Sequence, residues 1–365
     1  MKYIINNKMS QQISILKIIA IIMVVFIHAN VDVHLNNNIE YENNILLDIF
    51  KYIISENISK VSVPIFFLIS SILLYKKEFC WLSNVRRKIR TLMIPYIICN
   101  SFWIVIFLIL QNISLTSVFF TSKDNLILNW STIEWFNRYF YFNIADSKLM
   151  YPFLFPLWFI RDLFIMNIFA PVIKVIIDKT NILLLPIILI CYCLHIWIPN
   201  EYNYIYLNMQ SVVFFSLGYY FVKYNVVFEK INKLNTNIIS SIYIMLLAIG
   251  IILFIYHIEF RVVFYLTILT GIIFWIKISS IIVENKIKDK VLYLSKSIMM
   301  VYLFHEFTLT MIRKVLTKLL PQTISIQFFE YICAVLLTIF LTILLDKILK
   351  HYAEGVYLLI TGDRK

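Results

Sequence analysis

The chain has 365 residues, of which 61% are hydrophobic and only 15% are charged. An ordinary globular domain has about 25% charged residues, and a soluble protein of this length could not bury so much apolar surface in one core. The composition therefore excludes most soluble classes and indicates an integral membrane protein. The formal net charge of +12 would suggest nucleic-acid binding in a soluble protein. Here the basic residues lie in short segments between apolar runs, where they favour anionic lipid, so no nucleic-acid partner is expected.

Apolar runs along the chain predict about ten transmembrane helices. A helix needs about twenty residues to cross about 30 Å of hydrocarbon, or somewhat fewer at the short limit. The runs lie at about 13–30, 58–75, 92–111, 155–177, 181–199, 205–223, 238–257, 261–283, 290–314 and 325–349. They predict an all-α bundle that forms a single membrane domain over residues 1–365. Lys2 and Lys8 precede the first run and no small-residue cleavage site follows it, so we expect a retained anchor.

Basic residues between the runs predict the orientation. The densest basic cluster lies between the second and third runs and belongs in the cytoplasm by the positive-inside rule. It contains Lys76, Lys77, Arg86, Arg87, Lys88 and Arg90. Three more basic connections fall alternately on the same side, with Lys174 and Lys179, then Lys223, Lys230 and Lys233, then Lys286, Lys288 and Lys290. Both chain ends are therefore expected to be cytoplasmic, although the last outer loop is an exception because it also carries basic residues.

The outer loop at about 112–154 is rich in aromatic residues. They include Trp130, Trp135, Phe136, Tyr139, Phe140, Tyr141 and Phe142. Such residues either form an interfacial belt, which is the ordinary role of Trp and Tyr at a membrane surface, or form a platform that stacks on sugar rings.

Lys17 and His28 are ionisable residues inside the first run, where charge is costly and therefore points to function. A helix turns by about 1100° over this spacing, about 20° past three full turns. Both side chains therefore project from one face, roughly 16 Å apart along the axis. Lys17 would hold an anionic acyl carrier at the inner mouth, and His28 would activate a hydroxyl deeper in the membrane. The alternative is that Lys17 extends to lipid headgroups and His28 only ends the span.

Three other segments place polar residues within or beside apolar runs. The second run contains Ser62-Val63-Pro64 and Ser70-Ser71, and the basic cluster that follows it could bind phosphates. In the fourth run Trp158, Arg161 and Asp162 share a helix face. Arg161 and Asp162 are sequence neighbours about 100° apart, so each is expected to need another partner inside the bundle. The ninth run places Tyr302, His305 and Glu306 deep in the membrane.

Together these segments resemble the acyltransferase-3 family of polytopic membrane O-acyltransferases. The resemblance rests on Lys17–His28, Val63–Ser70, Arg86–Tyr96, Leu157–Leu163 and Tyr302–His305, whose order and spacing match across almost the whole chain. It implies a ten-helix bundle in the bacterial plasma membrane that takes an acyl group, usually acetyl, from cytoplasmic acyl-CoA. The implied acceptor is a hydroxyl of a cell-surface or lipid-linked glycan. The lack of a fused extracytoplasmic domain resembles the stand-alone branch of the family.

The resemblance also assigns roles to individual residues. The family's essential first-helix histidine corresponds to His28, which would act as general base or as part of a relay. The expected donor site consists of Lys17 with Arg86, Arg87 and Arg90, which would neutralise CoA phosphates. His305 and Glu306 are the other expected catalytic residues and would shape the buried polar cavity or orient His28. The expected cavity residues are Ser70, Trp158, Arg161, Asp162 and Tyr302. No metal is expected, since the five cysteines are scattered and most lie in apolar runs.

Two departures from the family pattern concern the donor site and the second span. The family usually has arginine at the position of Lys17, so the charge survives but the bidentate grip on phosphate does not. Where the family has Ser-Gly, this chain has Ser70-Ser71, and the side chain of the second serine hinders the close approach of another backbone.

The alternative function is a transporter or flippase for lipid-linked sugars or small solutes, since intramembrane charges suit it too. A non-catalytic membrane module is a third possibility, which the retention of His28 argues against.

Overall fold

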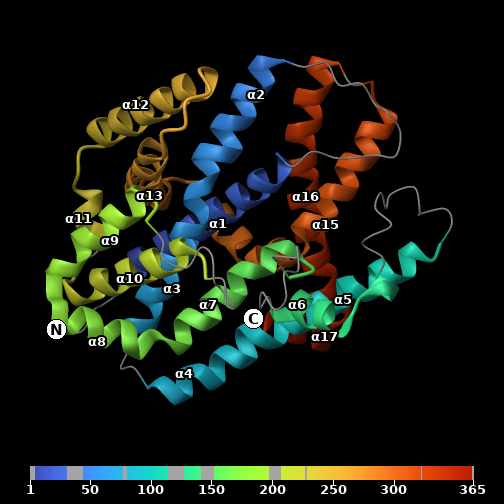
Figure 1. The fold of residues 1–365 in the computed structure, drawn as a ribbon, viewed down its shortest axis with the longest axis horizontal. Helices are drawn as coiled ribbons and strands as arrows, with labels where there is room; N and C mark the ends of the chain where they lie inside the picture. Colours follow the sequence, from blue (N-terminus) through green and yellow to red (C-terminus); the bar gives the residue numbers. More distant parts are fainter. Residues whose placement is uncertain are drawn as a thin grey trace.

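The structure is a computed structural model that describes residues 5–30, 44–76, 80–113, 127–140, 152–196, 207–226, 228–321 and 323–363. Every regular element in these ranges is helical, and no strand occurs in them, which confirms the predicted all-α class. The helices pack into one bundle (Figure 1). Within the described ranges, seven helices are long and apolar enough to cross a membrane by length and composition. The count of ten spans and the cytoplasmic placement of both ends stay predictions.

The first helix, α1 (Asn7–Ala29), runs through the centre of the bundle and packs against α3 (Ser62–Tyr75), α13 (Arg261–Glu284) and α15 (Ile298–Leu319) (Figure 1). The Asn6 side chain caps it by accepting a 2.8 Å hydrogen bond from the backbone N–H of Met9. Ile15, Leu16 and Ala20 are fully buried. Because α1 is continuous, the expected rise of roughly 16 Å between Lys17 and His28 holds.

The second helix is longer than its apolar run suggested. It is continuous from Ile45 to Tyr75 through α2 (Ile45–Lys51), a π-helical segment η1 (Tyr52–Ile58), a short 3₁₀ turn η2 (Ser59–Val61) and α3. The helix therefore begins at Ile45, ahead of the predicted start of the second span at about 58. Hydropathy does not predict this extension, because its polar side chains lower the mean hydropathy. These side chains have hydrogen-bond partners inside the bundle: the hydroxyl of Ser55, for example, donates to the Phe26 carbonyl at 2.5 Å.

Helix α10 (Met209–Lys223) packs closely on α3 at one small residue. A Cβ atom at Gly218 would lie 2.5 Å from the Cβ of Ser71 and 2.6 Å from the carbonyl oxygen of Leu68. Ser71 was expected to hinder close approach of another backbone, but the glycine that permits it lies on the opposite helix, at Gly218. Small residues that let backbones approach are a common basis of helix association in membranes.

Replacing Gly218 with alanine should lower the stability of the bundle by about 1–3 kcal/mol, the usual cost of overpacking a closely packed contact. The added methyl group meets backbone, which cannot rotate away. The unfolding temperature of purified protein in detergent measures the loss. Gly355→Ala is the matched control, because a Cβ there meets nothing within 4 Å. Equal unfolding temperatures for the two variants would show that the α3–α10 contact relaxes freely.

The predicted fourth span is interrupted, and its second part joins most of the predicted fifth span in one candidate membrane helix, Ala170–Cys193. The chain forms η7 (Phe155–Leu157), α7 (Trp158–Ile168), α8 (Ala170–Thr180) and, after a 3₁₀ turn, α9 (Leu184–Cys193). The break between α7 and α8 precedes Pro171. Because proline has no backbone N–H, it cannot continue α7. The carbonyls of Ile168 and Ala170 at the break accept hydrogen bonds from Trp81 and Tyr75, at 2.9 and 2.7 Å. Residues 197–199 and 205–206 of the predicted spans lie outside the described ranges.

The remaining helices complete the bundle. They are α4 (Trp81–Lys88), the π-helical η3 (Ile89–Met93), α5 (Ile94–Gln111), α6 (Thr132–Phe140), α11 (Phe228–Asn232), α12 (Thr236–Ile255), α14 (Lys288–Leu294), α16 (Ile324–Tyr352) and α17 (Glu354–Thr361). Helix α6 carries most of the described loop aromatics. Trp130 packs against Trp135 and under the Arg138 guanidinium, whereas Phe136 and Phe140 are exposed. Tyr141 and Phe142 lie outside the described residues.

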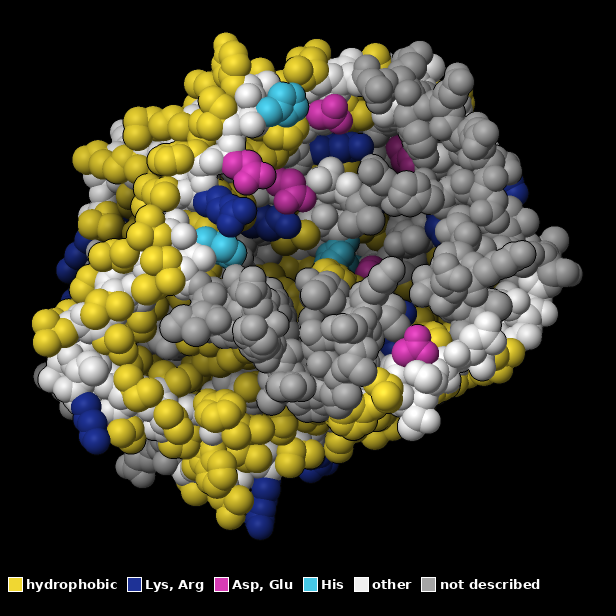
Figure 2. All heavy atoms as spheres, in the orientation of Figure 1, with side chains coloured by type: hydrophobic (Ala, Val, Ile, Leu, Met, Phe, Trp, Pro, Cys, Tyr) yellow, Lys and Arg dark blue, Asp and Glu magenta, His cyan; other side chains and the backbone are white. Residues whose placement is uncertain are grey.

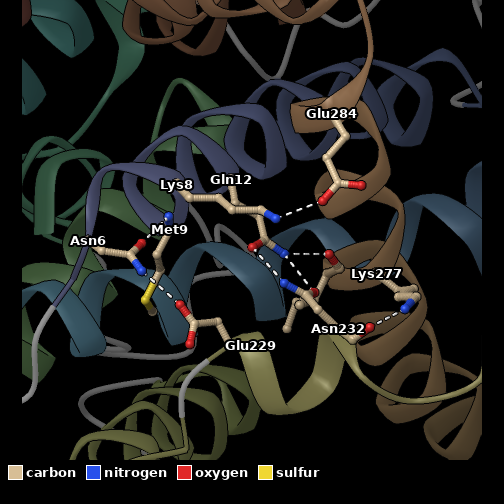
Figure 3. Close-up of polar contacts among 9 residues, drawn as sticks. Asn6, Lys8, Met9, Gln12, Glu229, Asn232, Lys277 and Glu284 are labelled. Atoms are coloured by element: carbon tan, nitrogen blue, oxygen red, sulfur yellow. Dashed lines mark hydrogen bonds and ion pairs between the residues drawn. The ribbon is translucent and has the colours of Figure 1, made fainter.

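Several predicted inner connections meet at the N-terminal end of α1 (Figure 3). The Asn6 amide donates to Glu229 of α11 and Lys8 pairs with Glu284 of α13, both at 2.7 Å. Gln12 donates to the Ile276 carbonyl at 2.7 Å. These contacts bring the connections after α10 and α13 to the end of the bundle that holds the N-terminus. Which side of the membrane this end faces stays a prediction.

Candidate active-site cavity

His28 lies at the C-terminal end of α1 beside a second histidine. Its ring centroid is 5.0 Å from that of His305 on α15 and 5.8 Å from that of Phe155. His28 lines a cavity of about 210 Å³. The other lining residues are Val24, Ile27, Lys60, Val63, Phe66, Phe155, Pro156, Trp158, Phe159, Asn208, Gln210 and Tyr302. One apolar enclosure thus surrounds a few polar groups, as is typical of a ligand or reaction site.

His305 is fully buried, and its hydrogen bonds set its tautomer. Nδ1 lies 2.7 Å from the Tyr302 carbonyl oxygen and 3.1 Å from that of Val301. A carbonyl can only accept, so Nδ1 carries the proton and, in the neutral ring, Nε2 is the acceptor. Among the described residues, Nε2 has no hydrogen-bond partner. The ring therefore presents a lone pair in the immediate surroundings of His28.

Tyr302 ties α15 to the short turn before α7. Its hydroxyl donates to the carbonyl of Pro156 in η7. This bond holds Phe155, Pro156 and Trp158 in the cavity wall, close to the histidine pair. The predicted cavity residues Trp158 and Tyr302 are therefore both in place.

Arg161 and Asp162 lie behind this wall and pair with each other. The guanidinium Nη2 and Nε atoms lie 2.6 and 3.0 Å from Oδ1 of Asp162. The long arginine side chain folds back across the 100° between the two residues, so they also pair with each other. The other carboxylate oxygen, Oδ2, accepts the backbone N–H of Asn208 at 3.0 Å. Asp162 thereby positions Asn208, which lines the cavity, at the start of α10.

Three polar lining residues escaped the sequence analysis: Lys60, Asn208 and Gln210. Lys60 lies near the start of the predicted second span, where no role was assigned to it. It forms a 3.0 Å ion pair with Glu56, which also accepts a 3.1 Å hydrogen bond from Asn30. The i, i+4 spacing of Glu56 and Lys60 was the available signal, but it reads equally as an ordinary helix-surface pair.

Besides His28, two of the predicted catalytic and cavity residues line the cavity, Trp158 and Tyr302. Five others do not line it: Ser70, Arg161, Asp162, His305 and Glu306. Glu306 follows His305 on the same helix, and a step of 100° turns it away from the histidine pair. Its Oε2 atom is buried and has no hydrogen-bond partner within the described part of the chain. Ser70 is half-buried one helical turn beyond Phe66, which does line the cavity.

None of the four basic residues predicted to bind phosphates lines the cavity, and three of them are exposed. Arg86 and Arg87 lie on α4, where Arg87 donates to Asn84 at 3.1 Å. The side chain of Arg90 in η3 is 71% exposed and pairs with Asp363 near the C-terminus. Gly362 has φ +67° and lies against the backbone of residues 90 and 91, an approach open to glycine. Lys17 is half-buried on α1.

The described surface agrees with a polar site inside an apolar body. Figure 2 shows acidic, basic and histidine side chains gathered around a hollow in one face, with hydrophobic side chains over much of the surrounding surface. A membrane-embedded bundle keeps ionisable groups toward its interior or a water-filled cavity.

Comparison with known proteins identifies the family. Residues 10–347 match the family model described as an acyltransferase domain, Acyl_transf_3. No curated protein and no solved structure matched the chain. The matched range holds both histidines and every lining residue of the cavity. With this extent of match over a helical membrane bundle, the chain belongs to the acyltransferase-3 family and is a membrane acyltransferase.

Proposed function

We propose that this protein transfers an acyl group, most simply acetyl, from cytoplasmic acyl-CoA to a hydroxyl of a cell-surface or lipid-linked glycan at the bacterial plasma membrane. The observation that carries the proposal is the histidine pair at the cavity. A carboxylate or lysine would need a strongly shifted pKa to exchange protons near neutral pH, whereas imidazole is suited to it without one.

In the proposed reaction His28 is the general base. A ring nitrogen of His28 takes the proton of the acceptor hydroxyl, and the resulting oxygen nucleophile attacks the thioester carbonyl. The new C–O bond forms, the tetrahedral intermediate collapses, and the C–S bond breaks. The imidazolium of His28 then returns the proton to the departing CoA thiolate. His305 is proposed as a positioning residue: its unpartnered Nε2 belongs to the ring next to His28, and a shift of the two rings into hydrogen-bond distance would let it accept the other N–H of His28 and select the tautomer whose lone pair faces the substrate.

Hydrogen-bond donors in the same cavity support acyl transfer. The Lys60 ammonium and the side-chain amides of Asn208 and Gln210 line the cavity with His28. Negative charge develops on the carbonyl oxygen of the thioester in the transition state, and donors held in an apolar enclosure stabilise it more than water does. Asp162 supports this arrangement because it holds the backbone of Asn208.

The donor would enter from the end of the bundle that holds the N-terminus. Lys17 lies roughly 16 Å from His28 along α1, so an extended pantetheine arm could join phosphates near Lys17 to a thioester near His28. Arg90 is an accessible member of the predicted phosphate ligands, although its guanidinium pairs with Asp363. A phosphate group would have to displace that carboxylate, and the exposure of the pair makes this inexpensive.

Neutralising Lys17 or Arg90 should raise the KM for acyl-CoA more than it lowers kcat, since phosphates far from the thioester contribute binding that is equal in the ground and transition states. Lys17→Arg should be tolerated, because it restores a planar fork that matches phosphate. Asp363→Asn should lower the KM by releasing Arg90. Lys8→Gln is the control, since it removes a charge at the same end of the bundle. Equal KM values for all variants would leave Lys17 and Arg90 as topology signals.

The proposed reaction is tested with sealed inverted membrane vesicles and acetyl-CoA labelled in its acetyl group. We expect label to enter saccharide as an ester that mild alkali releases, and only when the protein is present. Saccharide that crosses the vesicle membrane without forming such an ester would instead establish the transporter alternative.

A further inference from the structure

The cavity at the histidine pair is small for the whole acceptor. Its volume is about 210 Å³, whereas pockets that enclose a small organic ligand usually measure about 300–1,000 Å³. The cavity has room for the reacting hydroxyl and the acyl group, but not for a sugar ring beside the thioester. The rest of the acceptor therefore needs a second binding surface within reach of His28.

A second, larger cavity lies between η1 and the turn that joins α12 to α13. Its volume is about 510 Å³, within the range of small-ligand pockets. Six of its lining residues carry the argument: Tyr52, Asn57, Phe254, Glu259, Phe260 and Arg261. None of them belongs to the site described above, and a wide π-helical turn such as η1 often marks a functional position.

The chemistry of this second cavity suits a sugar ring. Tyr52 stacks on Phe254 with ring centroids 4.2 Å apart and with an angle of 16° between the ring planes, which makes a rigid aromatic wall. Aromatic rings offer an apolar surface for the C–H groups of a pyranose, with a polar edge for its hydroxyls. Arg261 and Glu259 lie 3.6 Å apart at the rim and supply donors and acceptors side by side.

An amide lies at the floor of the same cavity. Asn57 is 3% exposed, and its Nδ2 donates to the Tyr52 carbonyl at 3.1 Å. A Cβ atom added at Gly250 would lie 3.5 Å from Oδ1 of Asn57, so the absence of a side chain at Gly250 leaves space above the amide. A buried, oriented carbonyl oxygen of this kind selects a ligand that can donate a hydrogen bond, such as a sugar hydroxyl or N-acetyl group.

One helix connects the two cavities. Asn57 lines the second cavity, and Lys60, three residues later, lines the first. Residues at this spacing are neighbours within one helical turn, whose pitch is about 5.4 Å. A saccharide chain that places one hydroxyl beside His28 can therefore extend past the outer part of this helix into the second cavity.

We propose that this second cavity binds a pyranose unit of the acceptor glycan next to the unit that receives the acyl group. The proposal rests on the proposed function for the identity of the ligand. It assigns acceptor recognition to η1 and the α12–α13 turn, and it separates recognition of the glycan from the chemistry at His28.

The test measures saccharide binding directly by saturation-transfer NMR on detergent-purified protein. The probes are methyl pyranosides of glucose, galactose and mannose, with the N-acetylglucosamine and glucuronate forms. Gly250→Leu fills the cavity without removing a polar group, and Gly250→Ala is its matched control because a Cβ there meets only ordinary contacts at 3.5 and 3.8 Å. Unfolding temperatures verify that both variants fold, and Asn57→Ala provides a second disruption.

We expect at least one pyranoside to bind wild type, His28→Ala and Gly250→Ala, and its signal to fall at least tenfold in Gly250→Leu and Asn57→Ala. Binding that persists in His28→Ala supports the subsite even if wild type transfers no acyl group, so the two proposals fail separately. Absence of binding by any pyranoside to wild type overturns the subsite. Equal binding in Gly250→Leu does so too, and loss of co-purified phospholipid from that variant would then identify a lipid site.

Discussion

Replacing His28 with alanine should lower the rate of acyl transfer by about 10²–10⁴-fold, the range that a positioned general base contributes. The side chain lies on the cavity wall with its ring 5.0 Å from that of His305, so its loss removes the group placed to take the hydroxyl proton. Insertion and folding should persist, because the ring is half-buried rather than part of the close-packed core.

The measurement is kcat/KM with labelled acetyl-CoA and purified protein at matched levels. His195→Ala is the control: this histidine lies beyond the end of α9, bonded to the hydroxyl of Tyr265, and it does not line the cavity. His257 is unsuitable as a control because it lines the second cavity. Wild-type kcat/KM in a correctly folded His28→Ala protein would contradict the assignment of the base.

Replacing Asp162 with asparagine should destabilise the bundle by about 3–5 kcal/mol, the usual cost of removing one partner of a buried ion pair. Asparagine keeps an oxygen that can accept the backbone N–H of Asn208, so the loss reports on the charge. The Arg161 side chain is 8% exposed and that of Asp162 is fully buried, so water cannot solvate the arginine that is left without its counter-charge.

Unfolding in detergent, followed by heat or denaturant, measures this loss. The double variant Arg161→Met with Asp162→Asn should recover most of the stability, because no unpaired charge then remains buried. Lys174→Ala is the control: it breaks an exposed ion pair with Asp178 and should change stability by no more than about 1 kcal/mol. Equal losses for Asp162→Asn and Lys174→Ala would show that the buried pair is solvated.

The sequence by itself determined the class of protein and the course of its first helix. Hydropathy is a local property that accumulates over about twenty residues, so the all-α membrane class follows from composition and run length. The relation between Lys17 and His28 was predictable for the same reason, because a continuous helix converts spacing directly into angle and rise. The family resemblance also follows from order and spacing along the chain, and the match over residues 10–347 confirms it.

The sequence predicts only part of the interruption of the fourth span. Pro171 signals a helix boundary, but whether a membrane helix kinks or breaks there depends on partners for the freed carbonyls. Those partners, Trp81 and Tyr75, come from other helices. The helical extension back to Ile45 was missed because hydropathy cannot show that polar side chains find partners inside a bundle.

Only the tertiary structure decided how the site is assembled. His28 and His305 lie on the first and fifteenth α-helices, and no local pattern states that two distant helices present their histidines to each other. Lys60 and Asn208 join them from two further parts of the chain. Arg161 pairs with its sequence neighbour Asp162, whose other carboxylate oxygen accepts from the backbone of Asn208. Helix periodicity assigns each side chain to a face of its own helix. Which faces meet is set by packing, by close contacts such as Gly218 against Ser71, and by the hydrogen bonds that most buried polar groups form.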